Sequence, residues 1–234
     1  MRIKSADDKT KRLALLQSLL SAPLLDDWQK SQLNNLIVKM RLGIQGEKDA
    51  AHYLDNHFID GKNHAVIHDF RIDVDGEIAQ IDHLLINRML DFYLLETKNF
   101  SGNLTISAHG EFSVRYGRDR TVNIPSPIEQ SKRHENVLRR LLKRLGIQTR
   151  TGRELRFMHV VLVDPKASIE RPNPQSFDSS MVIAADQFRT WQQAHLEKIG
   201  TLDLLGSAMN LRSSENLLEI AEKVARQHRP ENQL

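Results

Sequence analysis

Cysteine is absent from the chain of 234 residues, and this absence excludes several classes of protein. Without cysteine there is no disulfide scaffold, no thiolate nucleophile, and no zinc or iron–sulfur site with cysteine ligands. No apolar run approaches the roughly 18 residues that a membrane-spanning helix needs. A Gly-rich phosphate loop ending in Gly-Lys-Ser or Gly-Lys-Thr is also missing, so the chain is not expected to power its activity by hydrolysing ATP.

The first residues of the chain also match a secretory signal peptide poorly. Residues 13–16 are apolar, but Asp7 and Asp8 precede them where a leader carries positive charge. Gln17 and Ser18 then interrupt the apolar run. We therefore expect a cytoplasmic protein that does not associate with membranes.

The composition is that of a globular protein, with 40% apolar and 27% charged residues. The net charge is only +3, but residues 43–110 hold 5 basic and 11 acidic residues, whereas residues 111–156 hold 12 basic and 5 acidic ones. Acidic groups that gather a metal ion, followed by basic groups that attract phosphate, would give this pattern. Chance patchiness of a charged surface explains it equally well.

The spacing of apolar residues predicts a mixed α/β fold. We expect helices within 10–41 with a break at Pro23, and we expect Gly43 and Gly46 to separate them from the next helix. Ser126, Pro127 and Glu129 predict a capping box at the start of a helix that runs to Leu145. The other expected elements are strands at 66–72, 78–86 and 91–98 in an antiparallel meander, a weaker hairpin at 104–114, strands at 155–163 and 181–185, and helices at 186–198 and 214–228.

Chemistry-bearing side chains gather on two of these strands. Because side chains alternate between the faces of a strand, Asp82 shares a face with Gln80, and Glu96 shares one with Lys98. If the two strands pair, Asp82 comes near Glu96 and Lys98, while His83 faces away. Adjacent carboxylates repel unless a cation lies between them, and such hard oxygen ligands suit Mg²⁺ or Mn²⁺. The alternative is an ordinary ion pair between Glu96 and Lys98 at a sheet edge.

Glu47 is a further candidate, because it lies on the same helical face as Ile44, Ala51 and Leu54. A carboxylate that faces inward is costly unless something pairs with it. The alternative is a solvated side chain in a first helical turn, where the helix dipole favours negative charge.

Four segments together resemble the nuclease-related domain (NERD), a branch of the PD-(D/E)XK nuclease superfamily. They are Gly46-Glu47, Gln80-Ile81-Asp82-His83, Glu96-Thr97-Lys98-Asn99-Phe100-Ser101-Gly102 and Pro127-Ile128-Glu129-Gln130. The resemblance implies a restriction-endonuclease-like α-β-β-β-α-β core at 43–165, with a mixed sheet flanked by helices. An N-terminal helical extension at 1–42 and a C-terminal strand and helices at 166–234 would pack on this core. Ile81 stands where the superfamily pattern has proline, which supplies shape rather than chemistry.

The resemblance also implies Mg²⁺-dependent hydrolysis of phosphodiester bonds in DNA processing. By position, Asp82 and Glu96 would be metal ligands, Glu47 would complete the set, and Lys98 would position the attacking water. Gln130 would correspond to a helix glutamine near the metal, which is expected to be Mg²⁺ or Mn²⁺. The alternative function is a catalytically silent nucleic-acid-binding or scaffold module that keeps the fold.

DNA is the expected partner, with RNA as the other candidate. A protein partner or a second copy is a further expectation, through terminal-helix leucines such as Leu19 and Leu24. The basic residues on the helix have the alternative role of a solvated outer face. The residues expected to contact the nucleic acid are Gln80, Arg115, Arg118, Arg120, Lys132, Arg133, Arg139 and Arg140.

Overall fold

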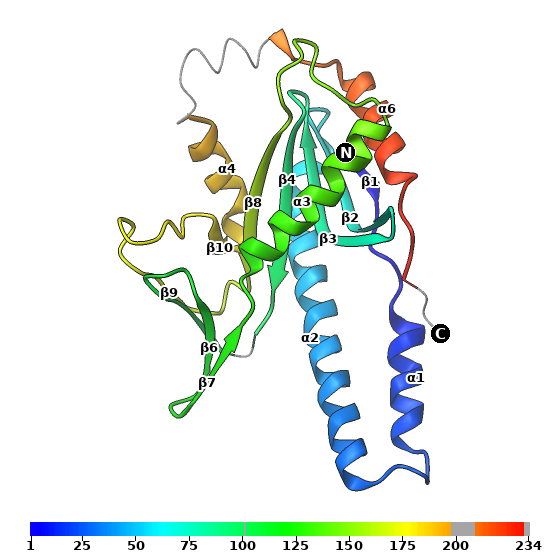
Figure 1. The fold of residues 1–234 in the computed structure, drawn as a ribbon, viewed down its shortest axis with the longest axis vertical. Helices are drawn as coiled ribbons and strands as arrows, with labels where there is room; N and C mark the ends of the chain where they lie inside the picture. Colours follow the sequence, from blue (N-terminus) through cyan, green and yellow to red (C-terminus); the bar gives the residue numbers. More distant parts are fainter. Residues whose placement is uncertain (101, 198–208, 232–234) are drawn as a thin grey trace.

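A computed structural model describes residues 1–100, 102–197 and 209–231. The protein is a mixed α/β structure in which a six-stranded sheet lies between two layers of helices (Figure 1). The strand order is β1-β2-β3-β4-β8-β10. These strands are β1 (Arg2–Lys4), β2 (His64–Val74), β3 (Glu77–Asn87), β4 (Asp91–Lys98), β8 (Arg156–Val163) and β10 (Val182–Ala184).

The predicted meander is confirmed, because β2, β3 and β4 pair antiparallel. Asp75 and Gly76 make the tight turn between β2 and β3, with φ of 57° and 80°. β8 pairs parallel with both β4 and β10, and β1 pairs parallel with β2. The expected mixed sheet is therefore present, whereas β1 was not predicted from the sequence.

The two faces of the sheet are covered by different helices. α2 (Asp27–Phe58) and α4 (Phe188–Glu197) pack on one face, with Leu54 and Phe58 of α2 buried there. α3 (Pro127–Arg144) and α6 (Ser214–Ala225) pack on the other. A 3₁₀ turn, η1 (Ala185–Gln187), precedes α4. Residue 198, where we expected the helix to end, and Ser101 of the NERD-like strings lie outside the described residues.

The predicted helix break at Pro23 is confirmed, since α1 (Thr10–Leu20) ends before it and α2 begins after it. The predicted break at Gly43 and Gly46 is wrong, because α2 runs through both. At Gly46 a β-carbon would lie 2.4 Å from Cβ of Asn99, so this glycine marks a close approach rather than a helix end. The cost of glycine inside a helix, about 1 kcal/mol, is offset by packing of the long helix. The three-part domain division stays a prediction, although α2 crosses its first boundary.

A second, four-stranded sheet follows β4, in the order β7-β6-β5-β9. Its strands are β5 (Asn103–Ile106), β6 (Phe112–Tyr116), β7 (Arg120–Ile124) and β9 (Ile169–Glu170). The expected hairpin corresponds to β5 and β6, whereas β7 was not expected. With this sheet as an insertion, the order α2-β2-β3-β4-α3-β8 agrees with the predicted α-β-β-β-α-β order. That the topology is restriction-endonuclease-like stays a prediction.

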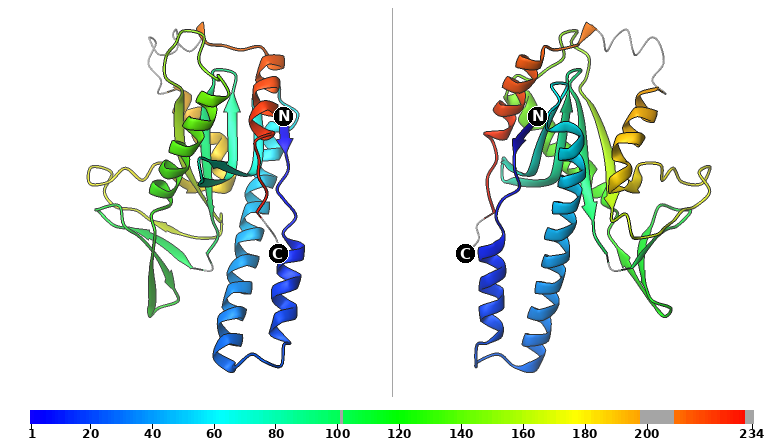
Figure 2. Two further views of the ribbon diagram at one scale, coloured as in Figure 1. Left: turned by 45° about the vertical axis from the view of Figure 1, so that its right-hand side comes forward. Right: turned by 180° about the vertical axis from the view of Figure 1, so that it is seen from behind.

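Two projections extend beyond the same end of the large sheet, the α1–α2 hairpin and the β6–β7 hairpin (Figures 1 and 2). The α1–α2 hairpin exposes apolar side chains, among them Leu19 at 44%, Leu24 at 93% and Trp28 at 71%. A protein partner at these helices stays a prediction. Within the described parts of the chain, no helix has both the length and the apolarity to cross a bilayer.

Candidate active site

The pairing of β3 with β4 brings Asp82 to Glu96. His83 pairs with Leu95 in this ladder, so one further step places Asp82 opposite Glu96. There Oδ2 of Asp82 accepts a hydrogen bond of 2.7 Å from the backbone N–H of Thr97. The donor is a main-chain group, so the backbone of β4 orients this carboxylate.

Glu96 is the centre of a polar cluster that joins β4 to α3. Its Oε1 accepts hydrogen bonds from Nζ of Lys98 at 2.8 Å and from Nε2 of Gln130 at 2.6 Å. Nζ of Lys98 also donates to Oε1 of Gln130 at 3.2 Å. Gln130 lies in the first turn of α3, where the side chain of Ser126 caps the backbone N–H of Glu129. The expected ion pair is present, but the third member from α3 distinguishes it from an isolated edge pair.

Glu47 faces this region from α2, where Gly46 allows the helix to pass close to Asn99. The side chain of Glu47 is 21% exposed, and its Oε2 accepts a hydrogen bond of 2.7 Å from Nζ of Lys9. Glu47 is therefore half-buried and paired, in the middle of a long helix rather than solvated in a first turn. Lys9, just before α1, was not singled out by its sequence context.

Asp69 is a fourth carboxylate, and sequence reasoning missed it. The β2–β3 ladder skips Asp69 and the facing Asp82 without a change of register, and φ of Asp69 is 48°, so the backbone of β2 is irregular there. Oδ1 of Asp69 accepts a hydrogen bond of 2.8 Å from Gln80, and Oδ2 lies 3.4 Å from Nζ of Lys9. Gln80, predicted to contact nucleic acid, is thus held by Asp69. Only the polar Asp69 inside an apolar strand hints at this irregularity.

The electrostatics of the site follow from burying these charges together. Burial raises the pKa of Asp82 well above its usual range, and the charges of Glu96 and Glu47 raise it further. Burial also raises the pKa of Glu96 against the effect of Lys98, and the pKa of Glu47 against the effect of Lys9. Burial disfavours the charged form of Lys9, but Glu47 and Asp69 outweigh it and raise the pKa of Lys9. A cation among the carboxylates would relieve their repulsion.

The donor set suits a hard cation, since Asp82, Glu96 and Glu47 offer carboxylate oxygens. Asp82 engages only Oδ2 in a hydrogen bond within the described residues. As the side chains stand, no three His, Cys, Asp or Glu groups in the described chain are arranged to hold a metal ion. The ammonium groups of Lys9 and Lys98 occupy oxygens of Glu47 and Glu96. The residues fit Mg²⁺ or Mn²⁺ chemically, since Oε2 of Glu96 and Oε1 of Glu47 accept no hydrogen bond from another described residue.

The arginines of the β6–β7 hairpin that are predicted to contact nucleic acid have exposed side chains. Arg115, Arg118 and Arg120 are exposed, and none of them forms an ion pair with another described residue. The guanidinium of Arg120 lies over the ring of Tyr116, 5.6 Å from its centroid. These three side chains belong to the β6–β7 hairpin, which projects beyond the end of the large sheet (Figure 1).

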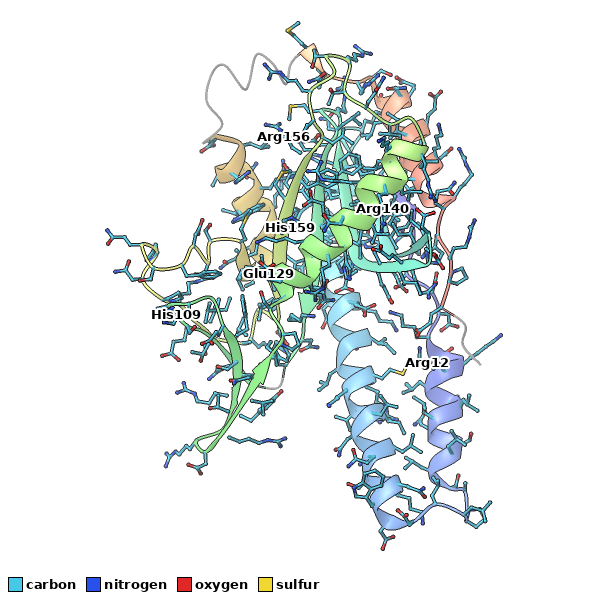
Figure 3. All side chains as sticks on the ribbon, viewed as in Figure 1. Arg12, His109, Glu129, Arg140, Arg156 and His159 are labelled. Carbon is cyan, nitrogen blue, oxygen red and sulfur yellow. The ribbon has the colours of Figure 1, made fainter. Side chains whose placement is uncertain are left out.

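Unlike the arginines of the hairpin, most of the predicted contact residues on α3 interact with other side chains of the protein. Arg140 pairs with Glu77 of β3, and Arg139 lies over the ring of Phe157, 4.2 Å from its centroid. Figure 3 shows Glu129 near the start of α3 and Arg140 farther along the helix. Glu129 bonds Lys132 at 2.7 Å, so only the Ser126 half of the predicted capping box forms. Of the predicted contacts on α3, Arg133 alone is exposed without an ion pair among the described residues.

The NERD-like strings agree with a comparison against known families. Residues 42–163 match the family model described as the nuclease-related domain, over more than half of the 234 residues. The chain belongs to the NERD family. This assignment is consistent with the PD-(D/E)XK superfamily, and the matched region of this NERD protein includes Glu47, Asp82, Glu96, Lys98 and Gln130. No curated protein and no solved structure matches the chain.

Proposed function

We propose that this NERD protein is a metal-dependent nuclease that hydrolyses phosphodiester bonds in DNA. The observation that carries the proposal is the convergence of Asp82, Glu96 and Lys98 where β3 meets β4, with Gln130 reaching in from α3. A lysine next to paired carboxylates suits a reaction in which negative charge grows on a phosphate. Because a fold alone does not fix an activity, the proposal is based on these side chains and not only on family membership.

In the reaction, a water oxygen attacks phosphorus, the bond to the leaving oxygen breaks, and that oxygen takes a proton. Asp82, Glu96 and Glu47 would hold Mg²⁺ or Mn²⁺, which when bound lowers the pKa of water and neutralises phosphate charge. Lys98 would turn from Glu96 toward the water or a phosphate oxygen. Gln130 then keeps its hydrogen bond to Glu96 and holds that carboxylate in place.

Substrate would approach along the β6–β7 hairpin, where Arg115, Arg118 and Arg120 offer exposed guanidinium groups to a phosphate backbone. Their contacts are independent of base sequence, so they support binding to many sequences. RNA carries the same phosphates and is the alternative substrate.

The experiment is incubation of the protein with linear duplex, closed circular and single-stranded DNA, and with RNA, in Mg²⁺, Mn²⁺ or EDTA. We expect cleavage of DNA in Mg²⁺ or Mn²⁺, none in EDTA, and none by Asp82→Ala. Cleavage of circular DNA identifies an endonuclease, whereas cleavage restricted to linear DNA identifies an exonuclease. Cleavage in EDTA, or full activity of Asp82→Ala, would contradict the proposal.

A catalytically silent nucleic-acid-binding module is the second candidate. One observation favours it: Lys9 and Lys98 already neutralise Glu47 and Glu96, and no three-ligand arrangement exists among the described residues. Such a protein would bind DNA through the β6–β7 hairpin in EDTA and in Mg²⁺ alike. DNA binding without cleavage of any of the four substrates would establish this function instead.

A further inference from the structure

Lys9 supplies a second ammonium group to the candidate site. Its Nζ lies 2.7 Å from Oε2 of Glu47 and 3.4 Å from Oδ2 of Asp69, so it bridges carboxylates from two elements. The Lys9 side chain is 18% exposed and that of Asp69 is 4% exposed. A cation that two half-buried carboxylates share holds the kind of position that a metal ion takes between carboxylate ligands.

The segment that leads to Lys9 is anchored by residues just before it. Nζ of Lys4 donates to the backbone oxygen of Asp69 at 3.1 Å, and the backbone N–H of Asp7 donates to Oδ2 of Asp69 at 3.2 Å. Asp7 also pairs with His228 from the C-terminal part of the chain, at 2.8 Å. The backbone oxygen and the carboxylate of Asp69 therefore fix the N-terminal segment at the point where Lys9 reaches Glu47.

The charges of the site balance with one divalent ion. Four carboxylates, those of Glu47, Asp69, Asp82 and Glu96, face two ammonium groups, those of Lys9 and Lys98. Metal binding requires ionised carboxylates, and with all four ionised two negative charges remain, which a single divalent cation neutralises. A second divalent cation would leave a positive excess in a half-buried site, where an uncompensated charge is costly.

From this arrangement we propose that Lys9 takes the place of a second metal ion, so that the site binds one divalent cation per chain. The inference rests on the proposed metal-dependent function and adds the number of ions. The single ion binds at Asp82, Glu96 and Oε1 of Glu47, while Lys9 acts as a positioning residue that holds Oε2 of Glu47. Lys9 lies outside the matched residues 42–163, so the one-ion site is a property of this chain's N-terminal segment.

The test measures the number of Mn²⁺ ions bound per chain by isothermal titration calorimetry. The protein is first treated with EDTA and freed of metal, and no DNA is present, so the result does not depend on activity. We expect one Mn²⁺ per chain for the parent. Lys9→Met keeps the length of the side chain but frees Glu47 and Asp69, and we expect two Mn²⁺, the second bound more weakly. The double variant Lys9→Met with Asp69→Asn restores the charge count, and we expect one Mn²⁺ again. The exposed Lys11→Met is the matched control and should bind one.

Two Mn²⁺ per parent chain, or one per chain for folded Lys9→Met, would overturn the inference. Thermal unfolding checks the fold of each variant, and if Lys9→Met does not fold, the stoichiometry of the parent still decides. Failure of the proposed function looks different, because the parent would then bind no Mn²⁺ at all.

Discussion

Nδ1 of His68 and Nδ1 of His83 lie 2.8 Å apart in the core, so one of them donates a proton and the other accepts it. Nε2 of His68 lies 3.1 Å from Oδ1 of Asp55, which only accepts, so Nε2 carries the proton and Nδ1 of His68 is the acceptor. Nδ1 of His83 is then the donor, and its Nε2 accepts from the hydroxyl of Thr97 at 3.2 Å. Burial lowers the pKa of both histidines, in agreement with two neutral rings.

This hydrogen-bonded chain predicts different effects for two substitutions of Thr97. Thr97→Val leaves Nε2 of His83 without a donor and should cost about 1–3 kcal/mol of unfolding free energy. Thr97→Ser keeps the hydroxyl and should cost clearly less. Both keep the backbone N–H that holds Asp82, so Mn²⁺ affinity should stay within about threefold, the scale of a few tenths of a kcal/mol. Urea unfolding measures the difference, and equal stability of Val and Ser variants would contradict the assigned hydrogen bond.

Asp82→Asn should stabilise the metal-free protein at neutral pH. A carboxyl group with a raised folded-state pKa binds more protons folded than unfolded above pH ~4, so stability falls as pH rises through that pKa. Asparagine carries no charge and avoids this loss of stability, and its side-chain oxygen can still accept the hydrogen bond from the backbone N–H of Thr97. In EDTA at pH 7 we expect a higher melting temperature, by about 2–4 °C for each kcal/mol gained. The gain should shrink toward pH ~4, where the unfolded carboxyl is also protonated.

The control for that measurement is Asp60→Asn, at an exposed carboxylate, which should change the melting temperature little at any pH. A gain for Asp82→Asn that grows toward acid pH would show that the carboxylate is stabilised, not destabilised, by its surroundings.

The two groups of basic residues should differ in their effect on DNA binding. Arg118→Ala with Arg120→Ala should weaken binding and reduce the salt dependence, by about 0.9 log unit per decade of salt for each lost phosphate contact. Arg139→Ala with Arg140→Ala should change the slope less, because these side chains contact Phe157 and Glu77. Fluorescence anisotropy at several salt concentrations gives the slopes. A larger change for the α3 pair would move the interface from the hairpin to α3.

Lys98→Ala should separate catalysis from binding. Removing a positioned ammonium should slow cleavage by on the order of 10² or more, the scale of losing one preorganised electrostatic group. DNA affinity should change little, since one charge contact among many phosphate contacts is worth about 0–1 kcal/mol. Lys98→Arg should not restore the rate, because its planar fork is aimed differently from a compact ammonium. Single-turnover rates and binding constants measured together distinguish this from equal losses of rate and affinity, which would make Lys98 a binding residue.

The parts of the site that lie on regular elements could be predicted from the sequence. Strand alternation predicted the meeting of Asp82 and Glu96, because the short turn between Asn87 and Asp91 joins β3 to β4 and leaves few registers. The N-cap at Ser126 predicted the start of α3 and, through it, the position of Gln130. These are local signals, carried by residues a few positions apart.

Contacts between distant segments could not be predicted in this way. Lys9 reaches Glu47 across 38 positions, and no local pattern connects them. Asp69 interrupts an apolar strand, but strand alternation assumes a regular ladder and does not reveal that the pairing is interrupted at Asp69. Glycine disfavours helices, so the sequence predicts a boundary at Gly46, whereas its packing against Asn99 decides its conformation.

β1 and β10 form the two edges of the large sheet, and both lie outside residues 42–163. A fragment cut to those residues would uncover the backbone donors and acceptors of β2 and β8, strands whose Val66 and Val161 have no exposed surface. Open apolar edges of this kind recruit strands from other molecules. We therefore expect such a fragment to aggregate, so the stretch of sequence that defines the family is poorly suited to stand alone.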